Sequence, residues 1–397
     1  MVKKVIIIHE NFFREHRDMG IDLFREKGLE VELWSLYYIK YRKKSNIPIP
    51  ADGRKDKVVY LHSYIEIIYR ILKEKRSNVV FFFTTIAHRN GIEDFIRIVI
   101  GMTRHKYCDL CHEMCPVGRI QLKGASKRKS ILEKIKGKIK GKYLWYKGKI
   151  YQAVIKHLCP PMYIFISTHY AWRNILLSWE FNKAIAIHNK NYDEYILAKR
   201  ESRKYNDEKY IVYIDDDLCN AEDFRKTGRI PIYAEEKLFY SNILRTFDLI
   251  EEYYNMKIVI AAHPKAEYKG DEFGKREIVY YRTRELVENA QLVLTHNTTA
   301  IDFVVLYKKP FIFLVDKYIK VDMIWEYLVL PMIEELHINA YDFGNEQNLM
   351  PWNYINYPSK YYDIYCRNFI NETSEENTKL FFETVYDYIT SENKNRG

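Results

Sequence analysis

QLVLTHNTTAIDFVVLYKKPFIF, residues 291–313, contains one complete repeat of an α/β sheet. A strand-like apolar run ends at Thr295-His296, a polar turn follows, and the run AIDFVVLY predicts a helix before a second strand-like run that begins at Pro310. A strand, a crossover helix and a second strand form the building unit of a parallel sheet. This stretch therefore predicts an open α/β domain.

The same alternation extends over most of the chain. Predicted strands in the first half are 4–9, 29–36, 57–62, 78–85, 163–168 and 184–189, and those in the second half are 210–215, 230–233, 257–263, 276–281, 291–296 and 310–316. The chain has 397 residues, which is about twice the usual domain length. We therefore expect two Rossmann-like parallel-sheet domains.

The domain boundary is predicted in the charged, non-periodic stretch 195–209. The N-terminal domain is placed at 1–200 and the second domain at 205–345, and 346–397 is expected to form a helical segment that packs back on the domains. The first residues do not form a signal peptide, no stretch has the length of a membrane span, and the six cysteines indicate free thiols. These features predict a cytoplasmic location.

The net charge of +10 comes from one segment, residues 123–149. It contains eleven Lys or Arg and one acid, Glu133, so the rest of the chain is neutral. Ile131, Ile135 and Ile139 would place an apolar stripe under basic side chains in a helix. We expect either a solvated basic helix or peripheral contact with an anionic membrane surface. Nucleic acid is not an expected partner, because no known nucleic-acid-binding motif accompanies the charge.

The stretch KIVIAAHPKAEY, residues 257–268, ends a predicted strand with a His-Pro pair. Pro264 cannot continue a strand ladder, so it fixes a turn in which His263 can donate a hydrogen bond to an anion, and Lys265 adds a positive charge. Histidines often serve structural roles in such places. The simplest ligand for this turn is a phosphate.

The turn Asn297-Thr298-Thr299 precedes the predicted helix of the opening stretch. Unpaired backbone N–H groups, the helix dipole and two hydroxyls could bind an anion there. Plain N-capping by Asn297 or Thr298 explains the same residues without a ligand.

Three consecutive carboxylates follow the strand YIVYI in YIVYIDDDLCNAEDF, residues 210–224. One of Asp215, Asp216 and Asp217 could act as a general base toward an attacking hydroxyl. A solvated acidic loop is the alternative interpretation.

These three stretches, in this order, resemble bacterial surface-polysaccharide glycosyltransferases of the two-domain GT-B type, in particular those that use CMP-activated sugars such as Kdo and sialic acids. The resemblance extends from AIHNKNYDEYI (186–196) through the opening stretch, about a third of the chain. It rests on the His-Pro pair and the hydroxyl-rich turn. Relatives often have Ser-Ser where this chain has Thr298-Thr299, and Gly where it has Leu218. A similar turn occurs in polyol-phosphate transferases of teichoic acid synthesis.

The resemblance implies a GT-B fold with a central cleft and assigns roles to residues at that cleft. The catalytic group would comprise Asp215, Asp216, Asp217 and His263, and the donor would be bound by His263, Pro264, Lys265, His296, Asn297, Thr298 and Thr299. The N-terminal domain would then bind the glycan acceptor through the residues that follow its strands, namely His9, Glu10, Asn11, His169 and His188.

The expected activity is transfer of a sugar from a nucleotide donor, with a CMP-sugar favoured, to a capsule, lipopolysaccharide or other surface glycan at the cytoplasmic membrane face. No metal or other cofactor is expected to be required. Three alternatives remain open: a teichoic-acid-type polyol-phosphate transferase, a nucleotide-sugar epimerase, and a non-catalytic glycan or nucleotide binder of polysaccharide assembly.

Cys108, Cys111 and Cys115, with His105 and His112 nearby, have a spacing that could hold zinc. A second ligand pair at knuckle spacing is absent from the sequence, so free thiols are the favoured interpretation.

Overall fold

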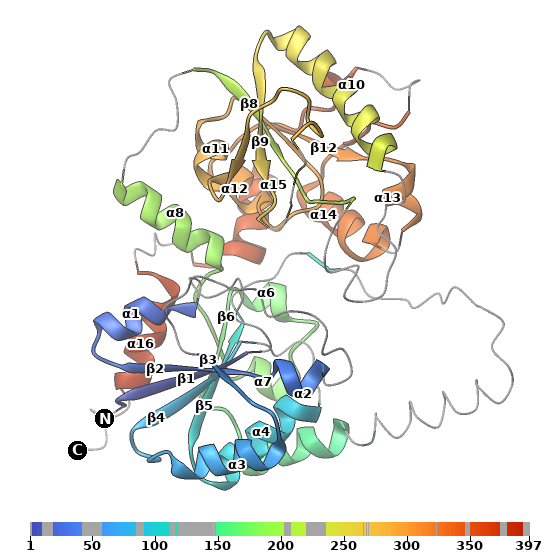
Figure 1. Cartoon of the computed structure of the whole chain (residues 1–397). Coiled ribbons are helices and arrows are strands. Elements are labelled where there is room, and N and C mark those ends of the chain that lie inside the picture. Colours follow the sequence, from blue (N-terminus) through green and yellow to red (C-terminus); the bar gives the residue numbers. More distant parts are fainter. Residues whose placement is uncertain are drawn as a thin grey trace, which may run out of the picture. The chain divides into compact units, whose positions relative to one another are not determined.

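The computed structural model describes residues 2–9, 19–41, 58–84, 91–111, 116–117, 146, 148–201, 208–219, 236–264, 266, 268, 270–322, 324–345, 350–373 and 379–391. The chain divides into two compact units (Figure 1). Unit 1 comprises residues 1–113, 123–190 and 377–397, and unit 2 comprises 114–122 and 191–376. The chain therefore passes from unit 1 to unit 2 at residue 190, and its last helix belongs to unit 1.

Unit 1 is built on a seven-stranded parallel sheet with the order β3-β2-β1-β4-β5-β6-β7. Its strands are β1 (Lys4–His9), β2 (Glu30–Ser35), β3 (Val58–Tyr60), β4 (Val79–Phe83), β5 (Lys106–Cys111), β6 (Tyr163–Ile166) and β7 (Ala184–Ala186). Its helices are α1 (Ile21–Glu26), α2 (Tyr37–Tyr41), α3 (Tyr64–Lys73), α4 (Gly91–Met102), a helix at 148–158, α6 (His169–Trp172), α7 (Ser178–Phe181) and α16 (Phe381–Ser391).

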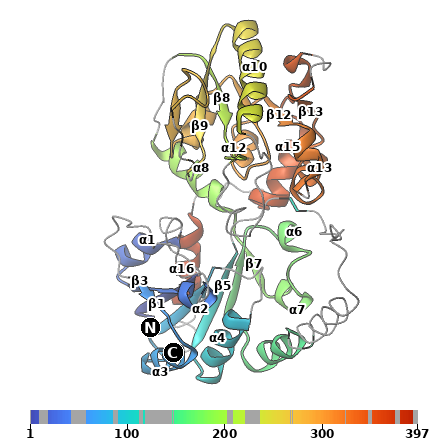
Figure 2. The ribbon, with the colours of Figure 1, turned by 45° about the vertical axis from the view of Figure 1, so that its right-hand side comes forward.

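Alternate residues of the unit 1 strands pack against helices on opposite faces of the sheet. Ile7 and Phe82 belong to the core cluster that includes α1 and α16, whereas Ile6 and Phe81 belong to the cluster under α3 and α4. Both views of the ribbon show helices on the two faces (Figures 1 and 2). Near-continuous apolar strands are expected when both faces of a parallel sheet are covered.

Unit 2 is built on a six-stranded parallel sheet with the order β10-β9-β8-β11-β12-β13. Its strands are β8 (Tyr210–Ile214), β9 (Lys257–Ala262), β10 (Ile278–Tyr280), β11 (Leu292–Thr295), β12 (Phe311–Val315) and β13 (Ala340–Asp342). Its helical segments are α8 (Lys190–Glu201), α10 (Glu236–Tyr254), α11 (Thr283–Asn289), α12 (Ile301–Leu306), α13 (Lys317–Val321), Trp325–Val329, α14 (Leu330–Leu336), Pro351–Tyr354, α15 (Lys360–Tyr365) and Cys366–Ile370.

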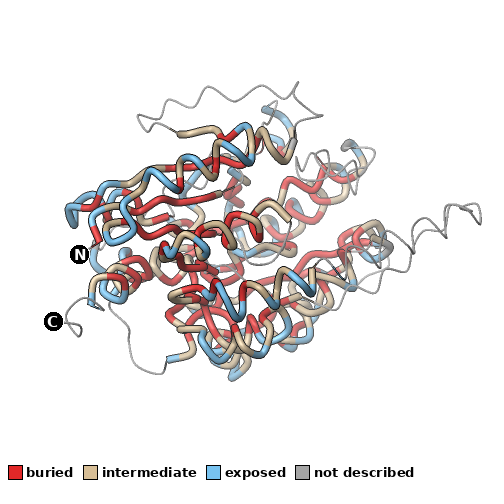
Figure 3. Tube along the Cα trace, turned by 90° about the horizontal axis from the view of Figure 1, so that it is seen from below, coloured by how far each residue is buried: buried red, intermediate tan, exposed pale blue. Residues whose placement is uncertain are grey.

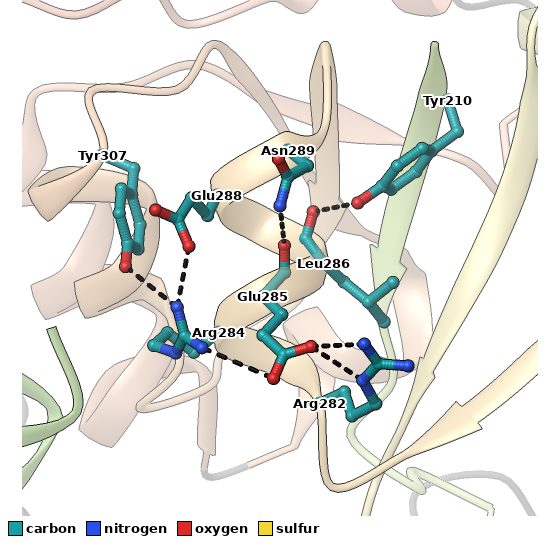
Figure 4. A network of polar contacts seen from close by, with 8 residues as sticks. All are labelled: Tyr210, Arg282, Arg284, Glu285, Leu286, Glu288, Asn289 and Tyr307. Carbon is teal, nitrogen blue, oxygen red and sulfur yellow. Dashed lines mark hydrogen bonds and ion pairs between the residues drawn. The ribbon is translucent and has the colours of Figure 1, made fainter. Parts of the chain in front are cut away.

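Polar contacts fix α11 beside the central strand of unit 2 (Figure 4). Arg284 lies 2.7 Å from Glu288 and is within 3.5 Å of both the Tyr307 hydroxyl and Glu285. The Tyr210 hydroxyl donates a 2.9 Å hydrogen bond to the carbonyl of Leu286. Because Tyr210 begins β8, these contacts hold the strand whose other end carries the three consecutive Asp residues.

The predicted two-sheet α/β architecture is confirmed. Eleven of the predicted strands are present, and 230–233 lies outside the described residues. The sequence interpretation missed β5 and β13. Cys108 and Cys111 belong to β5, where both are buried, free thiols, whereas Cys115 lies outside the described residues.

Two further expectations concern membranes. No helix in the described part of the chain combines the length and the apolar content needed to cross a bilayer. The predicted basic segment 123–149 lies almost entirely outside the described residues.

Along the described helices, exposed and buried stretches alternate, as expected for helices that pack by one face (Figure 3).

Candidate functional site

The three sequence stretches that predicted a site end on adjacent strands of the unit 2 sheet. β8 pairs with β9 on one side and with β11 on the other, and Ile214 is in register with both Ala261 and Thr295. The chain fills one half of the sheet with β8, β9 and β10 before it crosses to β11. The strand order reverses between β8 and β11, which makes this pair the topological switch point. Open α/β sheets bind ligands there, beyond the carboxyl ends of their strands.

Asp216 and Thr298 join the two loops at this switch point. The Thr298 hydroxyl donates a hydrogen bond to the Asp216 carboxyl, which lowers the pKa of that carboxyl. Burial and the neighbouring Asp215 act in the opposite direction and are stronger, so the pKa of Asp216 lies well above its usual value, although the residue retains some solvent exposure. A carboxyl with a raised pKa is a stronger base than an ordinary carboxylate when it is ionised.

The buried carboxyl of Asp215 contacts the hydroxyls of two tyrosines. The Tyr213 hydroxyl is 3.2 Å from Asp215 Oδ1, and the Tyr268 hydroxyl donates a 2.5 Å hydrogen bond to Oδ2. The backbone N–H of Asp217 also donates to Oδ2, at 3.2 Å, from the left-handed region at φ 50°. Burial raises the pKa of Asp215, and these hydrogen bonds offset only part of that effect.

His296 extends this network into the core. Its Nδ1 is 2.9 Å from the carbonyl of Leu314, and its Nε2 is 3.0 Å from the Tyr213 hydroxyl. A carbonyl only accepts, so the ring proton lies on Nδ1 and Nε2 accepts from Tyr213. The ring is 1% exposed, and burial lowers the pKa of His296 to about 4, which keeps it neutral.

The hydroxyl of Tyr213 contacts both His296 Nε2 and Asp215 Oδ1, and it has a single proton to donate. When that proton goes to His296, the contact with Asp215 is satisfied if Asp215 itself carries a proton and donates it. Both contacts are therefore satisfied when the proton shared along the Asp215–Tyr213–His296 chain lies on Asp215, and the raised pKa of Asp215 favours this form.

The His-Pro turn lies beside this network. The backbone N–H of His263 donates to the Tyr268 hydroxyl, whose own proton goes to Asp215. The His263 side chain is half-buried and Pro264 is exposed at the strand end. Lys265 lies outside the described residues. Since β9 is adjacent to β8, this turn and the Asp residues occupy the same edge of the sheet.

The loop after β11 contains an unsatisfied acceptor. Asn297 Oδ1 is buried and forms no hydrogen bond with any described residue. Thr299 is exposed, and its carbonyl accepts a 2.9 Å hydrogen bond from Asn191. The predicted helix is present as α12, which begins at Ile301. The Thr298 hydroxyl accepts a 3.3 Å hydrogen bond from the backbone N–H of Ala300, so Thr298 satisfies a backbone donor at the start of this helix, as the capping interpretation expects.

The predicted acceptor residues of unit 1 fall into different environments. His9 follows β1, and its Nδ1 contacts the hydroxyl of Thr84, which follows β4. Because β1 and β4 flank the switch point of the unit 1 sheet, this pair occupies the same position there as Asp216 and Thr298 in unit 2. Glu10 and Asn11 lie outside the described residues.

The other two histidines of unit 1 differ in exposure. His169 is half-buried, with its ring 5.1 Å from that of Phe181. His188 is 0% exposed and packs against Phe381 of α16, so it leaves no surface for a glycan. The His188 ring therefore contributes to the core packing of unit 1.

Sequence reasoning missed Tyr213, Tyr268 and Thr84. Tyr213 stands two residues before Asp215 on the same side of β8, and that alternation was the only available signal. Tyr268 and Thr84 are brought to the site by loops and strand order, which a single sequence does not fix.

Few positive charges surround these groups. The described residues of the three loops, 215–219, 263–264 and 296–299, include no Lys or Arg. In the described part of the chain no group of three His, Cys, Asp or Glu side chains could hold a metal ion. Each of these carboxyls that carries a proton therefore lowers the repulsion that an anionic ligand meets at this edge.

Comparison with known proteins supports the fold. No family model and no curated protein matches the chain. Among solved structures, the wall teichoic acid polymerase TagF is similar, with a TM-score of 0.50 and 11% sequence identity over 100% of this chain and 90% of that chain. The UDP-GlcNAc 2-epimerase from Methanocaldococcus jannaschii has a TM-score of 0.45 and 15% identity over 97% of this chain and 99% of that chain. The likeness to TagF, together with the two parallel sheets, places the chain in the GT-B fold class.

Proposed function

We propose that this protein is a glycosyltransferase that moves a sugar from a nucleotide donor, with a CMP-sugar favoured, to a surface glycan. The supporting observation is the hydrogen bond between Thr298 and Asp216 at the switch point of the unit 2 sheet. It joins the hydroxyl-rich turn to a carboxyl with a raised pKa, and the Thr298 hydroxyl would turn its proton from Asp216 to the phosphate when the donor binds. Phosphate binding and proton acceptance are the two functions that such a transfer requires.

The donor would lie across the loops that follow β9, β8 and β11. Thr298 and Thr299 supply hydroxyls for the phosphate, and His263 supplies an imidazole from the other side. Asn297 Oδ1 is an acceptor without a partner among the described residues, and a small movement of the loop would present it to a donor hydroxyl or amine. Lys265 would add its charge to the leaving phosphate.

Asp216 is the proposed general base. It is the least buried of the three carboxyls and is held in place by Thr298. Asp215 is buried, and its proton is shared with Tyr213, so we assign it a positioning role. Asp217 is also buried and, through its backbone N–H, holds the Asp215 carboxyl in place.

The charge of the site favours a donor with a single phosphate. Protonation of Asp215 removes one negative charge from the edge, and the described residues of the three loops provide no cation. At the phosphate a CMP-sugar carries one negative charge, whereas a nucleoside diphosphate sugar carries two; Kdo and sialic acids have their second charge on the sugar carboxylate. Repulsion of the donor phosphate by Asp216 and Asp217 is therefore smaller for the CMP-sugar.

The acceptor glycan is assigned to the carboxyl edge of the unit 1 sheet. The His9–Thr84 pair lies at its switch point, and His169 follows the nearby strand β6. Imidazoles and hydroxyls suit a ligand that offers mainly hydroxyl groups. Glu10 and Asn11 would extend the same edge.

Donor competition tests the activity. The purified protein is incubated with a CMP-sugar and a glycan acceptor, and the release of CMP is compared with and without the acceptor. Acceptor-dependent release of CMP supports the proposal. Conversion of a nucleotide sugar without any acceptor would instead indicate an epimerase, and binding without turnover would indicate a non-catalytic protein.

A second candidate is a polyol-phosphate transferase of the teichoic acid type. The observation that favours it is the shared fold with TagF over the whole chain. Such an enzyme would transfer from CDP-glycerol or CDP-ribitol and release CMP with no CMP-sugar present. The same assay, run with these donors, separates the two candidates.

A further inference from the structure

Exposed apolar side chains gather on three helices of unit 1. Eight of the fifteen large hydrophobic side chains that are exposed among the described residues lie on or beside α3, the end of α4 and the helix at 148–158. They are Tyr64, Ile65, Tyr69, Leu72, Met102, Tyr146, Ile150 and Leu158. Where such side chains lie together, they commonly mark an interaction surface.

Helix α3 is apolar on two opposite faces. Ile67 and Ile71 are fully buried in the core under the helix. Ile65, Tyr69 and Leu72 follow the spacing of the other face, and Ile65 is 79% exposed. A surface helix ordinarily carries polar residues on its outer face. The apolar outer face of α3 therefore indicates contact with another surface.

The C-terminal ends of the three helices meet. His105, which follows α4, places its Nε2 3.0 Å from the carbonyl of Glu74, the residue that caps α3. Cys159, which follows the helix at 148–158, packs on Gly101 of α4 so closely that a Cβ on Gly101 would lie 2.2 Å from the Cys159 Cβ. Three exposed apolar residues therefore lie at one place on the unit: Leu72 (60%), Met102 (74%) and Leu158 (71%).

Basic side chains surround these three residues. They are Lys73, Lys75, Arg76, Arg104 and Lys156, and none of them forms an ion pair with a described residue. The one acid of residues 72–76, Glu74, is 2.9 Å from Lys4, which also pairs with Glu30 and Glu32, so cations outnumber acids in this stretch by three to one. Cations at helix C-termini also complement the helix dipole, but that effect does not account for exposed leucines and a methionine among them.

We propose that this basic-apolar surface, formed by Leu72, Met102, Leu158, Lys73, Lys75, Arg76, Arg104 and Lys156, docks unit 1 on an anionic lipid bilayer. Clustered cations attract the headgroups while the three apolar side chains enter the interfacial region. Tyr69, whose ring lies under the Lys73 ammonium at 4.2 Å, has the amphipathic character of residues at a membrane interface. The charge pattern favours a membrane over a second copy of this chain, because two such surfaces would repel each other.

The position of this surface suits the proposed acceptor site. The three helix ends precede β4, β5 and β6, so the surface lies at the amino edge of the unit 1 sheet. His9 and Thr84 lie at the carboxyl edge of the same sheet. Docking would therefore leave that edge uncovered.

Vesicle co-sedimentation of the full chain tests the proposal. We expect binding to vesicles that contain phosphatidylglycerol and little binding to phosphatidylcholine alone. The Lys75→Glu/Arg104→Glu variant should bind anionic vesicles at least tenfold more weakly, because each cation near the surface contributes several-fold. The Leu72→Gln/Met102→Gln/Leu158→Gln variant should also weaken binding, and the remaining binding should disappear at high salt.

Matched controls lie on unit 2. Lys237→Glu/Lys257→Glu reverses the same number of exposed charges, and Met350→Gln/Tyr357→Gln removes exposed apolar side chains. Both should bind as the unchanged protein does, and circular dichroism confirms that each variant is folded. Equal loss in the control and surface variants, absence of binding to anionic vesicles, or self-association that the apolar triple variant abolishes would each overturn the proposal.

Discussion

The hydroxyl of Thr298 donates a hydrogen bond to the carboxyl of Asp216 and so connects the loops that follow β11 and β8. Each of these residues lies in a separate stretch of sequence, and the strand order brings them together at the switch point of the unit 2 sheet. Under the proposed function, the phosphate and the reacting hydroxyl would meet at this contact. The predictions for unit 2 start from it.

Asp216→Asn is expected to lower kcat about 100-fold or more, because a general base commonly contributes that much to the rate. The affinity for CMP should change less than threefold, since the amide keeps the shape of the side chain and its contact with Thr298. Initial rates and calorimetric CMP titration check both values. Asp271→Asn, on an exposed part of unit 2, is the control. A large loss of CMP affinity with unchanged kcat would refute the assignment of the base.

Asp215→Asn is expected to retain most of the activity and stability. An amide can donate to Tyr213 and accept from Tyr268, as the protonated carboxyl does. Asp215→Ala removes both interactions and leaves the Tyr268 hydroxyl without its acceptor and the Tyr213 oxygen without the contact to Asp215, so it should lower the free energy of unfolding by about 1–3 kcal/mol. Urea denaturation of the two variants measures this difference. Equal loss in both would mean that Asp215 is ionised and that the proton count is wrong.

The pH dependence of stability gives a separate test of the shared proton. The lowered pKa of His296 makes its contribution to stability rise between about pH 4 and 6.5, because the unfolded chain binds a proton there that the folded chain does not bind. The raised pKa of Asp215 acts in the opposite direction above about pH 4, because the folded chain keeps a proton that the unfolded chain has lost. In the unchanged protein the two contributions therefore offset each other.

Replacing either partner should reveal opposite slopes. In Asp215→Asn, the lowered pKa of His296 makes stability rise from pH 4 to 6.5, by at most about 3 kcal/mol. In His296→Gln, the raised pKa of Asp215 makes stability fall as the pH rises above about 4. Unfolding free energies at several pH values, relative to the unchanged protein, measure both slopes. Slopes of the same sign would contradict the shared proton.

Unit 1 contains a buried ion pair with a measurable effect on stability. Arg97 donates to Asp109 Oδ1 from Nε at 3.1 Å and from Nη2 at 2.7 Å, and its guanidinium lies 4.2 Å from the ring centre of Phe83. Asp109→Ala leaves a buried cation without this partner and should lower the free energy of unfolding by about 3–5 kcal/mol.

A compensating pair of substitutions separates charge from packing at this position. Arg97→Met/Asp109→Leu removes both charges and should recover part of the lost stability, because the buried Asp94, 3.8 Å from Arg97, then loses this cation. Breaking the exposed pair between Lys308 and Asp363, by Asp363→Ala, should change stability by less than about 1 kcal/mol. Chemical denaturation measures all three variants. If the double variant is as unstable as Asp109→Ala, packing rather than charge explains the loss.

The sequence predicted the two-sheet fold because apolar strand runs and helix-length segments alternate regularly. It missed β5 because Lys106–Cys111 contains an Asp and two Cys, which resembled a thiol cluster more than a buried strand. Strand β13 was missed because it has only three residues. In both cases the tertiary environment, rather than the local pattern, decides the conformation.

The candidate site was predictable as three strand ends, but not as a network. Asp215, His263 and His296 each follow an apolar run, which is a local signal. That His296 faces the core and that Tyr213 lies between it and Asp215 depends on the register of β8 with β11. The burial of His188 depends on α16, which is almost 200 residues away in the sequence. The local periodicity of a sequence does not predict such long-range contacts.

The most direct test of the central claim is calorimetric titration of CMP into the unchanged protein and into Thr298→Val, which removes the hydroxyl at constant shape. We predict saturable binding to the unchanged protein and at least tenfold weaker binding to Thr298→Val, with Thr390→Val on α16 as the unaffected control. Equal CMP affinity in Thr298→Val, or no binding of CMP, CDP, UDP or GDP to the unchanged protein, would contradict a nucleotide site at the carboxyl edge of the unit 2 sheet.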